Sequence, residues 1–370
     1  MLNAAQYAIE NMETLDSPGL VYFHDIIVEN TEKAIALAGG AERLWPHVKS
    51  HKTRELIAMQ RAMGIARFKC ATIAEAQMTA QSGGEDIILA YPLVGPYQQR
   101  FLTLVAMYPG IRFYAIGDDV EQLASLSEKS LAMGTRTRAL LDINMGMNRT
   151  GVPLDQAEAA YRACAKLPGL AMAGIHGYDG HRLESDFAER AAKAGPGIEA
   201  VHAIRDRLIR DGIPCGLLVM GGTPSFPVHA RQADEYLSPG TVFLADLACG
   251  AKAPELPFIP AAAVIARVVS HPAEALFTLD VGTKAIATEM PGPRGAILGY
   301  ENAEGVLQSE EHWVFRAAGE GRRPAVGETL LVIPTHICPT NALYSHATVI
   351  KDGKVFARWE IASRARSIGI

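Results

Sequence analysis

The chain has 370 residues, is 49% hydrophobic, and carries a formal net charge of −5 from 35 Lys and Arg against 40 Asp and Glu. This composition predicts a globular protein of about two to three domains with a large core. The acidic balance disfavours nucleic acid or an anionic membrane as a partner, and no apolar run approaches the length of a membrane span. The start of the sequence lacks a basic region followed by an apolar one, which favours a cytoplasmic protein.

Short apolar runs alternate with helix-like segments through the first two thirds of the chain. The runs are Leu44–Val48, Phe68–Ala71, Ile87–Tyr91, Phe113–Ile116, Ala139–Leu141, Met172–Ile175, Leu217–Met220 and Tyr236–Leu237. The helix-like segments include Arg54–Met63, Ala74–Ser82, Val120–Met133, Asp155–Lys166 and Asp186–Arg210. Eight strands, each followed by a helix or a connection, predict an α/β fold of the (β/α)8 barrel type. A doubly wound open sheet is the alternative, but no GxGxxG motif follows an early strand.

The pattern changes near residue 256, after which β-branched runs separated by turn signals predict an all-β domain. These runs are Ala263–Val269, Leu276–Val281, Thr329–Ile333, Thr348–Ile350 and Val355–Trp359. Asp352-Gly353 between the last two runs indicates a hairpin with a type I′ turn. We assign the early run Leu20–Phe23 to the same domain. The expected organisation is an N-terminal segment 1–25 packed with the β-domain, a barrel 26–250, and a C-terminal β-domain 251–370.

Glycine-rich loops follow the last two expected barrel strands. Barrel active sites lie at the C-terminal ends of the strands, and the loops after strands 7 and 8 often bind phosphate. Glycine lets backbone N–H groups approach an anion closely, and hydroxyl groups add further donors. The expected phosphate-binding residues are Gly221, Gly222, Thr223, Gly240 and Thr241. A simple tight turn is the alternative for Gly221-Gly222-Thr223-Pro224.

A lysine, Lys49, lies at the end of the first expected strand, among His47, His51 and Lys52. Burial and neighbouring positive charge both lower the pKa of a lysine, which makes its amine a nucleophile able to form a Schiff base. The alternative is that Lys49 and Lys52 pair with acidic groups at the barrel rim. A phosphate site and a Schiff-base lysine on one barrel face indicate pyridoxal 5′-phosphate (PLP) as cofactor.

Four further side chains follow strands 5 and 6. Arg149 provides a fixed cation for the cofactor's phenolate oxygen or a substrate carboxylate, with a rim ion pair as the alternative. Tyr178 provides a ring and a hydroxyl near the cofactor, and the alternative is that it is a tyrosine of the core. His176 and His181 beside it are candidates for acid–base work, although isolated histidines are often structural.

The five cysteines are scattered and contain no CxxC pair, so no disulfide framework is indicated. One of them, Cys338, follows His336 at a spacing of two residues. On a strand such residues point to the same side, so His336 and Cys338 can present an imidazole and a thiolate to one ion. Nitrogen and sulfur ligands suit Zn²⁺, with a partly buried His beside a buried Cys as the alternative.

These motifs resemble the D-threonine aldolase and D-serine dehydratase family over nearly the whole chain. Trp45–Lys52 is similar to the family's RPHxKxHK motif, whose first lysine carries the cofactor and corresponds to Lys49. Gly146–Gly151 resembles the GxxRxG stretch shared with alanine racemases, which implies that Arg149 lies at the phenolate side of PLP. The ring tyrosine, the phosphate loop and the metal pair are matched by Tyr178, Gly221–Thr223, and His336 with Cys338. The resemblance implies an alanine-racemase-like barrel with a C-terminal β-domain, in a homodimer.

What the resemblance implies about function is a lyase for D-3-hydroxy amino acids that uses PLP and a divalent metal, with Zn²⁺ preferred and Mn²⁺ or Mg²⁺ as alternatives. The His-x-Cys pair is that of the zinc-dependent dehydratases, whereas Pro339–Leu343 and Trp359–Ile361 are more similar to the aldolases. We therefore expect retro-aldol cleavage, with dehydration as the alternative. The Gln-His pair that aldolases carry after the ring tyrosine is missing, and His181 is the substitute acid–base candidate. A racemase and a non-catalytic PLP carrier are further alternatives, which the metal pair and the long β-domain disfavour.

Overall fold

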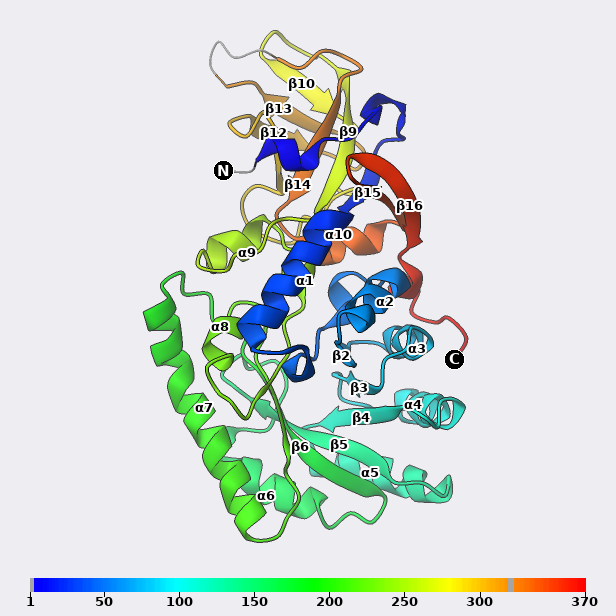
Figure 1. The fold of residues 1–370 in the computed structure, drawn as a ribbon, viewed down its shortest axis with the longest axis vertical. Coiled ribbons are helices and arrows are strands. Elements are labelled where there is room, and N and C mark those ends of the chain that lie inside the picture. Colours follow the sequence, from blue (N-terminus) through cyan, green and yellow to red (C-terminus); the bar gives the residue numbers. More distant parts are fainter. Residues whose placement is uncertain (1–2, 319–322) are drawn as a thin grey trace.

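The computed structural model describes residues 3–318 and 323–370, which form two sheets that follow each other along the long axis of the molecule (Figure 1). The first sheet is parallel, and in the described residues its strands run in the order β2-β3-β4-β5-β6-β7-β8. These strands are β2 (Arg67–Cys70), β3 (Asp86–Leu89), β4 (Arg112–Gly117), β5 (Thr137–Asn144), β6 (Leu170–Tyr178), β7 (Leu217–Met220) and β8 (Tyr236–Leu237). The predicted barrel-type α/β fold is confirmed.

The segment Leu44–Val48 differs from the strand that we expected there. It forms no ladder, but Leu44 bridges Leu237 of β8 and His47 bridges Lys69 of β2. The main-chain N–H of Lys69 also donates to the carbonyl of Pro46 at 2.8 Å. Since Pro46 has no N–H to donate, a regular ladder is interrupted at this point. The segment therefore closes the parallel sheet as a short extended connection.

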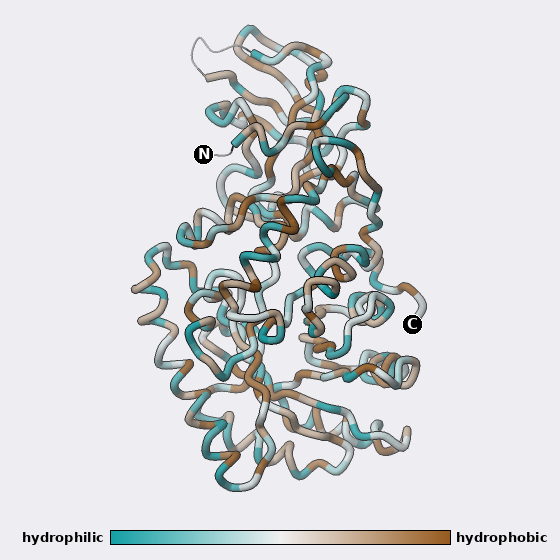
Figure 2. Tube along the Cα trace, in the orientation of Figure 1, coloured by the Kyte–Doolittle hydropathy of each residue, from teal (hydrophilic) through white to brown (hydrophobic). Residues whose placement is uncertain are grey.

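Helices cover the outside of the barrel (Figure 1). They are α1 (His24–Ala38), α2 (Arg54–Ala62), α3 (Ile73–Gln81), α4 (Pro96–Met107), α5 (Val120–Ala132), α6 (Leu154–Cys164), α7 (Phe187–Arg210) and the short α8 (Phe226–His229). Side-chain caps define several starts: Asp119 accepts from the N–H of Gln122 at 2.7 Å, and Asp186 accepts from that of Glu189 at 2.8 Å. Hydrophilic and hydrophobic residues alternate along α7 (Figure 2), as expected for a helix with one face on the barrel.

The second sheet is mostly antiparallel and has the order β12-β13-β10-β9-β1-β15-β16, with β14 paired to β9 and β11. Its strands are β1 (Gly19–Phe23), β9 (Ala262–Ser270), β10 (Leu276–Leu279), β11 (Gly295–Ile297), β12 (Glu304–Gln308), β13 (Trp313–Arg316), β14 (Thr329–Pro334), β15 (His346–Lys351) and β16 (Lys354–Glu360). The predicted hairpin turn between β15 and β16 is confirmed by φ angles of +50° and +74° at Asp352 and Gly353.

The N-terminal strand β1 belongs to this second sheet, where it lies parallel to β15 and antiparallel to β9. Two short helices, α9 (Leu247–Lys252) and α10 (Ile337–Leu343), lie where the two sheets meet (Figure 1). The amide of Asn341 on α10 donates to the carbonyl of Ser50, and its side-chain oxygen accepts from the hydroxyl of Tyr22 at 2.9 Å. These bonds hold α10 against the barrel segment that carries Lys49. The division at residues 25 and 250 stays a prediction.

Candidate active site

Lys49 lies in a 3-10 turn, Val48–Ser50, directly after the segment that closes the barrel. His47 precedes the turn, and its Nδ1 accepts from the main-chain N–H of Lys49 at 3.4 Å. The Lys49 Nζ lies 5.7 Å from the centroid of the Tyr178 ring, at the C-terminal end of β6. Burial lowers the pKa of Lys49, and the nearby Arg149 and Lys52 charges add to this effect. A larger share of this amine is therefore unprotonated, and nucleophilic, than in a lysine exposed to water.

The ring of Tyr178 is surrounded by three cationic side chains. Arg149, in the loop after β5, has its Cζ 4.8 Å from the ring centroid, and the Nζ of Lys69 lies at 5.6 Å. Lys49 is the third. Cations over an aromatic face are attracted by its negative potential. The arrangement brings positive charge from three barrel segments to one place at the strand ends, where it favours an anionic ligand.

Lys69 was missed by the sequence analysis. It lies on β2, is 2% exposed, and its Nζ is 3.4 Å from Nε2 of His176 on β6. Nδ1 of His176 in turn lies 2.7 Å from a carboxylate oxygen of Asp142 on β5. Burial lowers the pKa of Lys69 to about 7, and the charge of Lys49 adds to the effect. The available signal was a lysine inside a short apolar run, since lysine is almost never buried without a partner.

The two glycine loops meet at the hydroxyl of Thr223. Its Oγ1 accepts from the N–H of Gly240 at 3.2 Å and from that of Thr241 at 3.1 Å. A Cβ on Gly222 would stand 2.6 Å from Cε2 of Tyr178, so only glycine fits there without moving the ring. The structure thus brings the predicted residues of both loops together beside Tyr178. Their role in phosphate binding stays a prediction.

A buried ionic cluster lies below these loops. His229 on α8 has Nδ1 2.6 Å from Glu235 and Nε2 2.9 Å from Asp179, which follows Tyr178 in the chain. Burial opposes the charged form of His229, but the two carboxylates outweigh it and raise its pKa to about 10. The hydroxyl of Ser225 donates to Asp179 and accepts from the N–H of Gly222 at 3.1 Å. The cluster therefore fixes the glycine loop to the end of β6.

His336 and Cys338 do not lie on a strand, so that part of the sequence reasoning is wrong. Strand β14 ends at Pro334, His336 is the N-cap of α10, and Cys338 lies in its first turn. Pro339 follows, and proline is favoured in a first helical turn because its fixed φ is helical and its missing N–H is not needed there. The two side chains are nevertheless close enough to shift each other's pKa: Cys338 raises that of His336, and His336 lowers that of Cys338. Sγ of Cys338 lies 3.5 Å from Oγ1 of Thr241, which brings the pair to the barrel mouth.

Two carboxylates surround the His336–Cys338 pair, and neither was predicted. Nδ1 of His336 is hydrogen-bonded to Glu289, and the buried Asp246 accepts from the N–H of Ile337 at 3.0 Å. Burial raises the pKa of Cys338, but the neighbouring His336 outweighs this effect, so the thiol pKa is lowered. Within residues 3–318 and 323–370, no group of three or more His, Cys, Asp or Glu side chains has the geometry of a metal site.

His181 lies in the segment after β6. A Cβ on Gly146, in the loop after β5, would stand 3.2 Å from Nε2 of His181, so the imidazole packs against that loop. In the described part of the chain, Nδ1 of His181 is buried without a hydrogen-bond partner. Its acid–base role stays a prediction.

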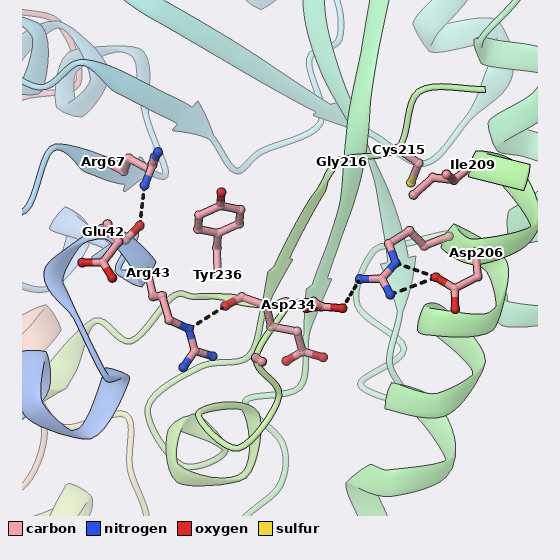
Figure 3. Close-up of a pocket in the computed structure, with 12 residues that line it drawn as sticks. Glu42, Arg43, Arg67, Asp206, Ile209, Cys215, Gly216, Asp234 and Tyr236 are labelled. Carbon is pink, nitrogen blue, oxygen red and sulfur yellow. Dashed lines mark hydrogen bonds and ion pairs between the residues drawn. The ribbon is translucent and has the colours of Figure 1, made fainter. Parts of the chain in front are cut away.

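A pocket of about 590 Å³ lies at the opposite end of the barrel, where Arg67 and Tyr236 begin β2 and β8 (Figure 3). Its arginines are already paired: Arg67 donates to the carbonyl of Glu42, and Arg43 donates to that of Glu235 at 3.3 Å. Catalytic residues of barrels lie at the other end of the strands. We therefore do not place the active site in this pocket.

No helix in the described residues is both long enough and apolar enough to cross a membrane. Residues 24–246 match the family described as alanine racemase, N-terminal domain, and residues 261–350 match the putative serine dehydratase domain.

Individual relatives match over almost the full length. The chain is 30% identical to a D-threonine aldolase of Arthrobacter sp. over 88% of this chain and 86% of the relative. It is 24% identical to a D-threo-3-hydroxyaspartate dehydratase of Delftia sp. (strain HT23), over 95% of this chain and 98% of the relative. The crystal structure of a D-threonine aldolase from Filomicrobium marinum superposes with a TM-score of 0.85 at 28% identity, covering 95% of this chain and 96% of that one.

Proposed function

Because this chain belongs to the alanine racemase N-terminal domain family and joins that domain to a serine dehydratase domain, we propose that it is a PLP-dependent lyase of D-3-hydroxy amino acids. Retro-aldol cleavage of the Cα–Cβ bond is the reaction that we favour. The D-threonine aldolase that is 30% identical supports it. The observation that carries the proposal is the 3.5 Å contact between Cys338 and Thr241, which joins the His336–Cys338 pair to the expected phosphate loop.

The residues at the barrel mouth fit PLP. Lys49 offers an amine of lowered pKa for the cofactor's carbonyl carbon, and Arg149 offers a cation for its phenolate oxygen. The N–H groups of Gly240 and Thr241 both donate to Oγ1 of Thr223, so three groups that are able to donate to a phosphate lie together in these loops. When bound, PLP delocalises the electron pair that bond cleavage leaves on Cα.

His336 and Cys338 would hold a divalent metal, and their nitrogen and sulfur donors fit Zn²⁺ better than Mn²⁺ or Mg²⁺. The lowered pKa of the Cys338 thiol favours the thiolate that a metal needs. Glu289 accepts a hydrogen bond from Nδ1–H of His336, which would keep that proton on Nδ1 and make Nε2 the atom that binds the ion once its own proton is lost. The chemistry that such a metal would supply is a lower pKa of the substrate's β-hydroxyl. His181 remains our candidate for the base that removes the hydroxyl proton.

The test is to incubate the purified protein with D-threonine, PLP and Zn²⁺ or Mn²⁺. Glycine and acetaldehyde support the aldolase proposal. Failure to form these or any other cleavage product from several D-3-hydroxy amino acids would overturn it. Lys49→Ala should lose the visible absorbance of the bound cofactor, and retention of that band would contradict the role of Lys49.

Dehydration is the second candidate, and the thiol of Cys338 favours it because the resemblance associates a His-x-Cys pair with zinc-dependent dehydratases. In that reaction the amine of Lys49 removes the Cα proton and the β-hydroxyl leaves. Formation of 2-oxobutanoate and ammonia from D-threonine would identify it. A homodimer is part of the same proposal, and its mass in solution is the test.

A further inference from the structure

We propose that Lys69 is a second acid–base group of this site: its amine, hydrogen-bonded to His176 and through it to Asp142, exchanges the proton that Lys49 must lose and return when it bonds to a carbonyl carbon. The inference rests on the proposed function, in which Lys49 is the amine that binds PLP. The proposal adds Lys69 to that site, as the residue that exchanges protons with Lys49.

The donor and the acceptor of each hydrogen bond in the series Asp142–His176–Lys69 follow from the chemistry of the partners. The carboxylate of Asp142 only accepts, so Nδ1 of His176 carries a hydrogen and donates it across 2.7 Å. Nε2 of the neutral ring is then an acceptor, and the Lys69 Nζ at 3.4 Å is the donor that faces it. The second oxygen of Asp142 accepts from the hydroxyl of Thr150 at 3.0 Å. An acidic group thus orients a histidine that faces an amine, which is the arrangement that activates nucleophiles and bases in enzymes.

Lys69 lies beside the same aromatic ring as the reacting amine of Lys49. Lys69 and Lys49 lie at 5.6 and 5.7 Å from the centroid of the same ring, that of Tyr178. Lys69 comes from β2, whereas Lys49 comes from the turn after the closing segment, so two separate barrel elements bring the amines to one place. Lys69 is 2% exposed, and therefore bulk water does not supply its protons directly.

The charges around Lys69 keep its two protonation states close in free energy near neutral pH. Burial and the cations Lys49 and Arg149 lower its pKa, the carboxylates Asp142 and Asp179 oppose them, and the resulting pKa is about 7. The other titratable groups that face this interior are His47, His176 and Tyr178. An acid–base group works best when its pKa is near the working pH.

The proposed step is balanced in atoms and protons. Unprotonated Lys69 takes a proton from the Lys49 ammonium, and the freed Lys49 amine adds to the carbonyl carbon. The Lys69 ammonium then protonates the carbonyl oxygen to a hydroxyl. The Lys49 nitrogen, which carries two protons after the addition, gives one of them to this hydroxyl and keeps the other, and the oxygen leaves as water. No oxidant or reductant is needed.

The experiment measures how fast the metal-free apoprotein captures PLP, by the absorbance of the bound cofactor, as a function of pH. Lys69→Met should slow capture at neutral pH by about 100-fold, the usual contribution of a positioned acid–base group. Lys69→Arg should be equally slow, because it keeps the charge but does not give up a proton. Lys284→Met, at an exposed lysine paired with Glu310, removes the same charge and should capture PLP at the wild-type rate.

Wild-type capture with an unchanged pH profile in Lys69→Met would overturn the proposal. So would a wild-type rate in Lys69→Arg, because Lys69 would then act through its charge alone. If far-UV circular dichroism reports that Lys69→Met is unfolded, His176→Asn replaces it: this variant should be slowed at least about tenfold, and an unchanged rate would count against the relay. Normal capture by Lys49→Ala would instead refute the proposed function, whatever the Lys69 variants do.

Discussion

Replacing His229 by glutamine should cost the protein about 4 kcal/mol of unfolding free energy at pH 7. In the native state the imidazolium donates to Glu235 at 2.6 Å and to Asp179 at 2.9 Å, and all three side chains are buried. The rise of the His229 pKa from 6.5 to about 10 corresponds to ~5 kcal/mol, of which ~4 kcal/mol remains at pH 7. Removing one partner of a buried charge pair costs ~3–5 kcal/mol in general, which agrees.

The pH dependence provides the sharper test. Because the folded-state pKa of His229 is raised, its contribution is fully present below the unfolded pKa of 6.5 and is lost as the pH rises towards 10. Urea unfolding followed by far-UV circular dichroism should therefore give a difference between wild type and His229→Gln that narrows over this range. His202→Gln is the matched control, since His202 donates to the same Glu235 at 2.8 Å from a partly exposed position and should cost ~1 kcal/mol or less. The reasoning would be refuted if His229→Gln lost less than ~1 kcal/mol of unfolding free energy, or if the difference in unfolding free energy between wild type and variant grew with pH.

Two further substitutions test the mouth of the barrel. Glu289→Ala should weaken Zn²⁺ binding about tenfold or more in a titration of the metal-free protein, because His336 loses the carboxylate that keeps a proton on its Nδ1. Glu289→Gln should weaken Zn²⁺ binding less, because the amide oxygen still accepts from Nδ1. Equal losses in the two variants would contradict this role of the carboxylate. Gly222→Ala should weaken PLP binding about tenfold with unchanged circular dichroism, because the new Cβ would stand 2.6 Å from the Tyr178 ring; undiminished PLP affinity would exclude a close fit there.

The barrel could be predicted from the sequence where local patterns and local caps agree. The segment Asp186–Arg210, for example, becomes the cap and body of α7, and the short run at Tyr236–Leu237 is the two-residue strand β8. Periodicity and capping act over a few residues, so one stretch of sequence contains the information. The prediction of a strand at Leu44–Val48 was wrong, because this segment forms only one isolated bridge to β8 and one to β2.

The candidate site could be predicted in its residue types but not in its full set of contacts. Lys49, Arg149 and Tyr178 converge because barrel strand ends meet at one edge, which the sequence pattern implies. Glu289 is invisible to such reasoning, because the loop that carries it reaches His336 only through long-range hydrogen bonds. One of these joins the N–H of Ala287 to the hydroxyl of Thr340 at 3.1 Å.

The position of β1 has a consequence for how the chain is made. On the ribosome β1 emerges before the barrel, yet Gly19 pairs with Ile265 and Val21 with Thr348, so both of its neighbours are translated after the whole barrel. Until then an apolar strand with two open edges stays attached to the nascent protein, and such strands are templates for aggregation. The same topology makes the chain pass between the two sheets twice. A rotation of the His336–Cys338 pair relative to Lys49 would have to bend both connections at once, and we expect the mouth of the barrel to keep one geometry throughout turnover.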